Sequence, residues 1–543
     1  MVYNIPMNKE QVPRRIQNIH GVDYIYEDFA SWDKTKKNAT HARRYIGKMV
    51  DNVFVPNKRY LLECELEAAK EKKSGPVPAT LSTREFCGAT YLFDQIGEKL
   101  GVTADLQACF PEIWKQLLSI AYYLILEDRN PLSRFPHWAK NHRHPYGASI
   151  SSQCSNDLFG AITEDAKQRF FLLQAKRRLE DEYLVYDTTS ISSYSELIKQ
   201  ARYGRNKDYE PLAQINLAFL FGQSSGLPVY YRKLAGNISD VSTIRQLIRD
   251  LSFLEIDKVK LVMDRGFYSE DNINALFEKH YKFLIGVKKS LRFVQDILDD
   301  VRDSMKTRAY YSADYGINVY SKTIEWSYTA QKPRSETTET GKRRIYLHLY
   351  FDDQKAVDDR ATFNSLLDTL EEEILTNQRT QEHESLYQKY YDIRTTAVRG
   401  TTIIPKQDAI TEIEKNYGYY ALMSNDIKDP LEALAIYRLK NLAEKAFHNL
   451  KERLSLRPTS VSSEQNLEGK LFVQFLALIY LSYISKAMND QKLHKTMTMH
   501  ELLDELDIIE CFGRPGHKTH YGEITKKQKS LYAALGIEAP ALV

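Results

Sequence analysis

The chain has 543 residues, of which 43% are hydrophobic and 27% are charged, and its formal net charge is +3. This length predicts roughly two to four domains. The composition is ordinary for a soluble globular protein. So small a net charge does not by itself indicate nucleic acid as a partner, because a nucleic-acid binder needs its basic residues clustered rather than numerous.

The cysteines and the apolar runs exclude several other classes. The five cysteines are scattered and form no C-x-x-C pair, which argues against a zinc site or a disulfide framework and fits a reducing cytoplasm. The N-terminus shows no signal peptide. The longest apolar run, 471–484, contains Gln474 and is too short to cross a bilayer, so we expect a buried core helix and no membrane partner.

The first 180 residues divide into two regions. Residues 1–75 are predicted to form a small basic domain in which strands at 22–29 and 44–50 flank a lysine-containing turn at 33–40. The tip of this hairpin is either a phosphate contact or an exposed loop that lysine keeps soluble. Residues 76–180 are predicted to be helical, since 89–100 and 113–126 have the helical period of apolar residues.

From residue 181 the pattern changes to strands that alternate with helices, which predicts an α/β sheet. Residues 181–290 carry the first part of this core and 417–488 the second part. Strands are expected at 183–187, 215–221, 228–234, 260–264, 282–287 and 419–424, and helices at 242–253, 270–280 and 467–488. Between the two parts, residues 291–416 are predicted to be a β-rich insertion with its own small sheet and an acidic helix at 363–375. Residues 489–543 form a tail with a helix at 499–506.

Residues 437–454 are predicted to form one continuous helix after the start signal Asp429-Pro430. At 100° per residue, four polar side chains fall within an arc of roughly 60°: Tyr437, Lys440, Glu444 and Lys451. A separate apolar stripe comprises Leu439, Ala443, Ala446, Leu450 and Leu454. The polar face is either a solvated surface or a carboxylate flanked by cations and a phenol.

Three acidic residues suggest a metal site. Two predicted strands end in Asp187 and Asp264, and carboxyl groups at strand ends meet at one edge of an α/β sheet. With Glu444 they would repel one another unless cations lie between them, and Mg²⁺ or Mn²⁺ meets that demand. Each aspartate alone is more often a helix cap or turn former, and it is their combination and order that indicate a metal site. Two ions held by all three could activate water or a 3′-hydroxyl at a phosphodiester, while Lys440 and Lys451 hold phosphates.

Several segments resemble those of the DDE transposases of the IS4 type. Residues 264–269 resemble the second catalytic block of this family. The spacing of Tyr437, Lys440, Glu444 and Lys451 matches the family's Y-R-E-K signature, with lysine at 440 in place of arginine. Two further segments lie between the first two aspartates: Gly226-Leu227-Pro228 and Gly236-Asn237-x2-Asp240. Within the group the chain is most similar to the IS1634-like branch, in which the N-terminal hairpin and residues 521–536 also have counterparts.

The resemblance implies a ribonuclease H-like mixed-sheet core interrupted by the β-rich insertion, with N-terminal hairpin and helical regions that bind DNA or support dimerisation. It implies that Asp187, Asp264 and Glu444 hold two Mg²⁺ or Mn²⁺ ions. Tyr437, Lys440, Lys451 and Arg265 would contact DNA. Trp326 of the insertion either stacks on a flipped base or is a core tryptophan. The partners would be double-stranded transposon ends and target DNA, bound by a homodimer in a prokaryotic, nucleoid-associated setting.

The leading hypothesis is therefore a transposase that cuts terminal inverted repeats and joins them to target DNA by metal-dependent chemistry. One alternative is an inactive relative that binds inverted repeats as a repressor. Another is a metal-dependent nuclease without strand transfer.

Overall fold

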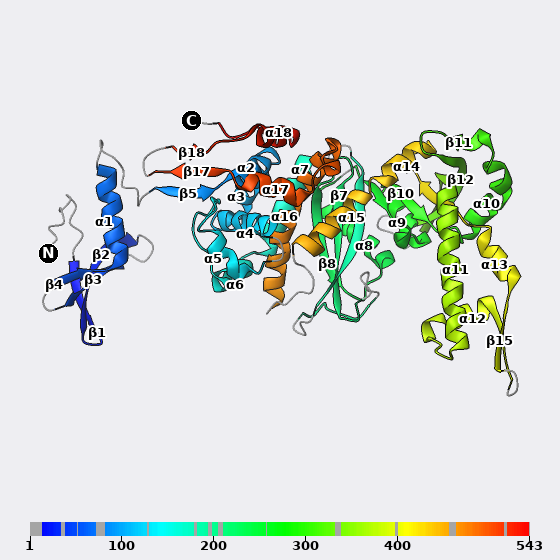
Figure 1. Cartoon of the computed structure of the whole chain (residues 1–543), viewed down its shortest axis with the longest axis horizontal. Coiled ribbons are helices and arrows are strands. Elements are labelled where there is room, and N and C mark those ends of the chain that lie inside the picture. The colour runs from blue at the N-terminus through cyan, green and yellow to red at the C-terminus, as the bar shows by residue number, and fades with distance from the viewer. Residues whose placement is uncertain are drawn as a thin grey trace. The chain divides into compact units, whose positions relative to one another are not determined.

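In the computed structural model, the described residues form two compact units. One unit comprises residues 1–85, 509–523 and 541–543, and the other comprises 86–508 and 524–540, each within its described residues. The described residues are 14–33, 38–50, 53–71, 82–127, 130–178, 182–193, 198–204, 210–256, 258–331, 338–396, 400–454, 463–514 and 518–541. Figure 1 traces the elements of both units.

The N-terminal unit contains an antiparallel sheet in the order β1-β2-β3-β4. Its strands are β1 (Arg14–Ile19), β2 (Val22–Asp33), β3 (Asn38–Val50) and β4 (Val53–Pro56), followed by α1 (Lys58–Glu71). The predicted hairpin is therefore confirmed as β2–β3, although its strands are longer than expected. Residues 34–37 of its tip lie outside the described residues, so their phosphate contact stays a prediction.

Much of the positive charge of this sheet is neutralised within it. Arg44 donates to Oε2 of Glu27 at 2.6 Å, and Arg15 lies 3.3 Å from Oδ2 of Asp28. Both carboxylates are buried, so they stabilise the sheet through paired charges. A second sheet of this unit joins β5 (Thr83–Phe86) to β17 (Glu510–Gly513) and β18 (His520–Tyr521), two strands that the polar tail pattern did not predict.

The larger unit begins with a helical region, as predicted. Its helices up to residue 178 are α2 (Gly88–Lys99), α3 (Val102–Cys109), α4 (Trp114–Leu126), α5 (Phe135–Trp138), α6 (Ser152–Gly160) and α7 (Glu164–Arg178), with the short 3₁₀ helix η2 (Leu132–Arg134). The later helices α17 (Met499–Asp507) and α18 (Lys526–Ala534) and the 3₁₀ turn η7 (Leu493–Lys495) belong to the same unit.

A long helix, α16 (Glu464–Asp490), is the core of this region. Ser463 caps it by accepting from the Asn466 amide at 3.1 Å, which extends the helix beyond the apolar run that the sequence showed. Among the described residues, α16 is long and apolar enough to cross a membrane, but 78% of its most apolar stretch is buried inside the fold. The predicted buried core helix is thus confirmed, and it is longer than the 471–484 run on which the bilayer prediction rests.

The centre of the unit is a nine-stranded mixed sheet in the order β11-β12-β13-β16-β10-β9-β6-β7-β8. Strands β6, β9 and β10 are parallel, and every other neighbouring pair is antiparallel. The strands are β6 (Leu184–Ser192), β7 (Gln214–Gly222), β8 (Pro228–Ala235), β9 (Lys260–Met263), β10 (Lys282–Val287), β11 (Tyr311–Ser312), β12 (Ile317–Gln331), β13 (Thr338–Phe351) and β16 (Tyr419–Ser424).

Helices cover both faces of the sheet near β6–β8. On one face the ring of Phe219 packs against Phe447 of α15 (Asn441–His448) at 5.5 Å, and Tyr231 packs against Phe475 of α16 at 5.2 Å. On the other face lies α8 (Asp240–Phe253), the crossover that leads to β9, while α9 (Glu270–Glu278) leads from β9 to β10. The predicted α/β sheet with crossover helices is confirmed.

The segment after β10 does not form a sheet of its own throughout. Strands β11–β13 continue the main sheet, because β13 pairs along the free edge of β16 from Tyr346↔Ser424 to Phe351↔Tyr419. The prediction of a separate small sheet is therefore wrong for these strands, and only β14 (Tyr391–Thr396) and β15 (Gly400–Pro405) form one. The other elements are α10 (Arg292–Met305), η4 (Arg308–Tyr310), α11 (Asp353–Leu375), η5 (Gln381–His383), α12 (Glu384–Tyr390) and α13 (Gln407–Glu414).

A satellite core holds the outer part of this segment together. It gathers apolar and aromatic side chains from α11, α12, β14 and α13, among them Phe363, Leu370, Tyr387, Tyr390 and Ile410. Helix α11 begins ten residues before the predicted 363–375, since Asp352 accepts from the Lys355 amide at 3.1 Å and starts the helix there. The six-part division of the chain predicted from sequence, with its boundary at 291–416, stays a prediction.

The Gly236-Asn237-x2-Asp240 segment owes its first residue to a close backbone approach. A Cβ atom at Gly236 would lie 1.9 Å from the carbonyl oxygen of Gln214 and 2.7 Å from that of Arg202. The Gln214 side chain also donates to the Gly236 carbonyl at 2.9 Å. Only glycine fits here without a shift of two backbone segments.

We expect Gly236→Ala to lower the stability of the chain by about 1–3 kcal/mol, because two carbonyl groups must move. Thermal unfolding followed by circular dichroism measures the effect. Gly160→Ala is the matched control, since its Cβ would meet nothing closer than the Asn466 side chain at 3.8 Å. Equal melting temperatures for both variants would contradict the assignment.

Candidate active site

Asp187 lies within β6, and Asp264 directly follows the neighbouring parallel strand β9. Tyr186 of β6 lies opposite Met263 of β9, so Asp187 and Asp264 take matching positions next to these residues. The prediction that both aspartates end their strands is wrong for Asp187, because β6 continues to Ser192 and stays paired with β7 over that length. Adjacent strands are about 4.8 Å apart. Asp187 is also in register with Phe219 of β7, whose ring contacts α15, so it lies on the face that α15 covers.

The segment 264–269 has a structural reason at almost every position. Asp264 caps the 3₁₀ turn η3 (Arg265–Phe267) by accepting from the Arg265 amide at 2.9 Å. Phe267 is buried against the ring of Tyr186 at 5.1 Å. Ser269 caps α9 by accepting from the Asn272 amide at 3.1 Å. The alternative interpretation of Asp264 as a helix cap is therefore also correct, and it leaves the second carboxylate oxygen available.

Tyr437 and Lys440 both contact Asp264. The Tyr437 hydroxyl donates to Oδ1 at 2.6 Å, and the Lys440 ammonium lies 3.2 Å from Oδ2. Burial alone would raise the pKa of Asp264, but the hydrogen bonds from Tyr437 and the Arg265 amide and the charge of Lys440 outweigh it and lower that pKa. The carboxylate is therefore ionised at neutral pH and suited to hold a cation.

The phenol of Tyr437 is a fixed hydrogen-bond donor. Burial raises its pKa well above the ordinary value, and the charges of Asp264 and Asp187 raise it further. The phenol consequently keeps its proton at any physiological pH.

Glu444 reaches the same cation from the helix. Its Oε1 lies 3.6 Å from the Lys440 ammonium, which thus lies within ion-pair distance of both Asp264 and Glu444. Among the residues that the structure describes, however, no three His, Cys, Asp or Glu side chains are placed to hold one metal ion. The carboxylates are brought near one another but stay apart, as like charges do when a single ammonium balances them.

The predicted continuous helix at 437–454 is wrong. Helix α14 (Pro430–Arg438) ends before Lys440, α15 begins at Asn441, and a π-helical turn, η6 (Asn449–Arg453), follows. At the break the Leu439 and Lys440 amides donate to the carbonyls three residues earlier, at 3.2 Å each. The break and the wider π turn change the angular positions that 100° per residue gave.

Two residues consequently differ from expectation. Leu439, predicted on the apolar stripe, is 41% exposed because it lies in the break, whereas Ala446, Leu450 and Leu454 are buried as predicted. Lys451 is only 8% exposed, while Glu444 is 58% exposed. The prediction that Tyr437, Lys440, Glu444 and Lys451 share one polar helix face is therefore wrong. The phosphate contact of Lys451 stays a prediction.

Arg265 and Trp326 lie in different surroundings. Arg265 is exposed next to Asp264 and has no ion-pair partner among the described residues, which suits a phosphate contact. Trp326 is half-buried, and its indole donates to Oδ1 of Asn274 at 3.2 Å and lies edge-on to Phe293 at 5.9 Å. These contacts are those of a packed side chain, and its stacking role stays a prediction.

Two neighbours of the site were not among the predicted site residues. Gly286 of β10 lies beneath Tyr437, since a Cβ there would be 2.8 Å from the Tyr437 hydroxyl and 3.0 Å from the Arg265 amide. Asp240 accepts from the Thr188 hydroxyl, next to Asp187, and would lie 3.3 Å from a Cβ at Gly266. The motif that contains Asp240 was visible in the sequence, whereas Gly286 carried no signal.

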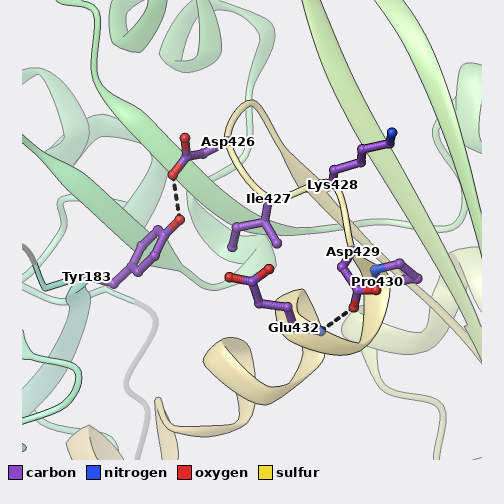
Figure 2. Close-up of a pocket in the computed structure, with 7 residues that line it drawn as sticks. All are labelled: Tyr183, Asp426, Ile427, Lys428, Asp429, Pro430 and Glu432. Atoms are coloured by element: carbon purple, nitrogen blue, oxygen red, sulfur yellow. Dashed lines mark hydrogen bonds between the residues drawn. The ribbon is translucent and has the colours of Figure 1, made fainter.

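A cavity of about 490 Å³ lies at the opposite edge of the sheet, where β16 ends and α14 begins (Figure 2). Tyr183 donates to Asp426 at 2.7 Å, and Asp429 caps α14 by accepting from the Glu432 amide at 2.8 Å. Lys282 lies 3.2 Å from the other oxygen of Asp426. These contacts fix the start of α14, whose other end carries Tyr437 to Asp264.

The donor set fits the divalent ions that the resemblance implies. Carboxylate oxygens are the ligands that Mg²⁺ and Mn²⁺ prefer. The Lys440 ammonium already lies as a cation beside both Asp264 and Glu444, so the electrostatics of this place favour positive charge.

Comparison with known proteins identifies the family. A family model described as "Transposase DDE domain" matches residues 179–480. No protein with a curated description matches the chain. A cryo-EM structure of the piggyBac transposase synaptic complex with hairpin DNA is similar at 11% identity and a TM-score of 0.32, covering 66% of this chain and 57% of that one. The chain thus spans a little over half the length of that chain.

The family match covers more than half of the chain, including the whole stretch from Asp187 to Lys451. The chain belongs to the transposase DDE domain family. Membership in this family implies an enzyme of DNA cleavage and strand transfer, a class that generally uses divalent metal ions.

We expect Gly286→Ala to push the Tyr437 hydroxyl away from Asp264 and to lower the melting temperature. In a Tyr437→Phe background the same change should cost less, because the hydroxyl oxygen that it would meet at 2.8 Å is absent. Thermal unfolding of the four members of this cycle measures the coupling. A zero coupling energy would show that Gly286 does not set the position of Tyr437.

Proposed function

We propose that this chain is a DNA transposase of the IS4 type, within its IS1634-like branch, and that Asp187, Asp264 and Glu444 are its catalytic carboxylates. One observation carries the proposal: Asp187 within β6 and Asp264 directly after β9 take matching positions on adjacent parallel strands, and the Lys440 ammonium links Asp264 to Glu444. Asp264 and Glu444 both lie beside Lys440 although the whole β-rich segment separates them in the sequence.

The sheet supports a ribonuclease H-like core as part of this proposal. Strands β6, β7 and β8 form an antiparallel meander, and β9 and β10 add in parallel beside β6 through α8 and α9. The β-rich segment then lies between the second aspartate and the glutamate, where the IS4-type resemblance expects an insertion.

Two Mg²⁺ or Mn²⁺ ions, when bound, would polarise the scissile phosphate and lower the pKa of water or of a 3′-hydroxyl. Asp187, Asp264 and Glu444 would hold them. Tyr437 fixes the orientation of Asp264 by its hydrogen bond to Oδ1 and leaves Oδ2 directed at Lys440. Asp240 accepts from the Thr188 hydroxyl next to Asp187 in β6, and Asn272 donates to the Phe267 carbonyl at 2.8 Å in the turn that follows Asp264.

The reaction would have two steps. In the first, the oxygen of water forms a bond to phosphorus at the transposon end, and the bond to the 3′-oxygen breaks and leaves a free 3′-hydroxyl. In the second, that hydroxyl attacks a phosphodiester of target DNA, and the 3′-oxygen of the target strand departs with the proton. A homodimer bound to two transposon ends would carry out both steps.

The edge of the sheet next to Asp264 is suited to hold the DNA backbone. Arg265 follows the aspartate, Lys288 follows β10, and Arg292 begins α10; all three are exposed and lack an ion-pair partner among the described residues. Unpaired cations beside a site of phosphodiester chemistry are suited to phosphate contact.

We expect Asp264→Asn to bind DNA from the ends flanking the coding region but to lose nicking in Mg²⁺, because a ligand charge is lost while the surface cations stay. Gel shift measures binding, and mapped 5′ and 3′ products measure cutting. Full nicking by this variant would remove Asp264 from the catalytic set.

The same DNA separates the alternatives. Wild-type protein that shifts end DNA but never cuts it in Mg²⁺ or Mn²⁺ would be an inactive binding protein. Protein that cuts, but does not join a pre-cleaved 3′-hydroxyl end to a plasmid, would be a nuclease without strand transfer.

We expect the double variant Arg265→Gln/Lys288→Gln to weaken DNA binding and to reduce the slope of log K against log salt by about 1 for each lost phosphate contact. Fluorescence anisotropy across a salt series measures this slope. Lys428→Gln is the control, since Lys428 is an exposed lysine at the opposite edge of the sheet. An unchanged slope in the double variant would place the DNA elsewhere.

A further inference from the structure

Lys440 has a position that the phosphate role assigned by resemblance does not explain. Its ammonium lies 3.2 Å from Oδ2 of Asp264 and 3.6 Å from Oε1 of Glu444. Among the described residues it is the one side-chain cation within ion-pair distance of either carboxylate. The side chain is 19% exposed, so it reaches solvent from a largely enclosed position.

Bound Mg²⁺ would lie about 2.0–2.1 Å from its carboxylate oxygens. An ammonium at 3.2 Å from the same oxygen of Asp264 would then be close to a divalent cation and would be repelled by it. The two cations therefore compete for these carboxylates. Metal binding requires Lys440 to leave, and whatever attracts Lys440 elsewhere makes metal binding more favourable.

The phosphate backbone of DNA is such an attractor. A lysine ammonium is a compact charge on a flexible four-carbon stem, so it can exchange one anionic partner for another. The ring of Tyr437, 5.2 Å from the ammonium, keeps the stem beside the site during the exchange. One ammonium cannot fully balance the two carboxylates and a DNA phosphate at the same time. Pairing of Lys440 with the phosphate and pairing with the carboxylates therefore exclude each other.

On the basis of the proposed function, we infer that Lys440 is a positioning residue that couples metal loading to DNA binding. Without DNA it balances Asp264 and Glu444 and opposes the binding of divalent ions. With DNA it pairs with a phosphate and frees both carboxylates. By linkage, DNA raises the affinity for the metal and the metal raises the affinity for DNA by the same factor.

Binding of Mn²⁺ to the full chain, measured by electron paramagnetic resonance, tests this inference without a reaction. The titration is done alone and with a saturating duplex from the flanking DNA, with the signal of protein-free duplex subtracted. Wild-type protein should bind Mn²⁺ more tightly with DNA, by a factor within the roughly 5- to 150-fold range of such couplings. Lys440→Gln should bind it more tightly without DNA and gain little or nothing when DNA is added.

Two further variants identify the cause. Lys440→Arg keeps the charge and should keep the weak DNA-free affinity, whereas Lys445→Gln, at an exposed lysine of α15, should behave as wild type. The inference is overturned if Lys440→Gln binds Mn²⁺ with unchanged or lower affinity in the absence of DNA. It is also overturned if DNA leaves the affinity of the wild type unchanged.

Asp264→Asn separates this inference from the proposed function. If the wild type and Asp264→Asn bind Mn²⁺ alike, the assignment of the carboxylates fails, and the inference fails with it. If Asp264→Asn alone loses Mn²⁺ while Lys440→Gln equals wild type, the carboxylate site stands and only the coupling role of Lys440 is rejected.

Discussion

The contact of Asp264 with Tyr437 and Lys440 is the interaction on which the rest of the site depends. A short hydrogen bond and an ion pair join the end of β9 to the end of α14 and the start of α15, across a long separation in sequence. A half-buried carboxylate without these partners would have a raised pKa and would tend to take up a proton. With them it stays ionised, and the two helical pieces are held at the edge of the sheet where Asp187 also lies.

Small residues make this contact possible. Gly286 leaves room for the Tyr437 hydroxyl above β10, and Gly266 leaves room for Asp240 beside η3. At the other edge of the sheet, contacts of Asp426, Asp429 and Tyr183 fix where α14 starts. The length of α14 then determines the position of Tyr437 in its last turn. The geometry of the site is therefore set by both edges of the same sheet.

The break between α14 and α15 gives Lys440 its place. In a continuous helix its side chain would share one face with Glu444 and Lys451, directed at whatever that face meets. In the broken helix Lys440 lies in the turn, close to Asp264 as well as to Glu444, while Lys451 is buried. A π-helical turn directly after α15 is a further departure from regular geometry, and such turns occur often at functional sites.

The sequence by itself determined the elements whose cause is local. Apolar periodicity located the strands β6–β10 and β16 and the core helix α16, and it placed Asp187 and Asp264 on neighbouring strands, although β6 continues beyond Asp187 to Ser192. Spacing also brought Tyr437, Lys440 and Glu444 into one stretch. Only the tertiary structure decided that β13 pairs with β16, that the helix breaks at Lys440, that Lys451 is buried and that Gly286 supports Tyr437. These features arise from contacts between residues far apart in the chain, whose steric and electrostatic demands override the regular period that local sequence expresses.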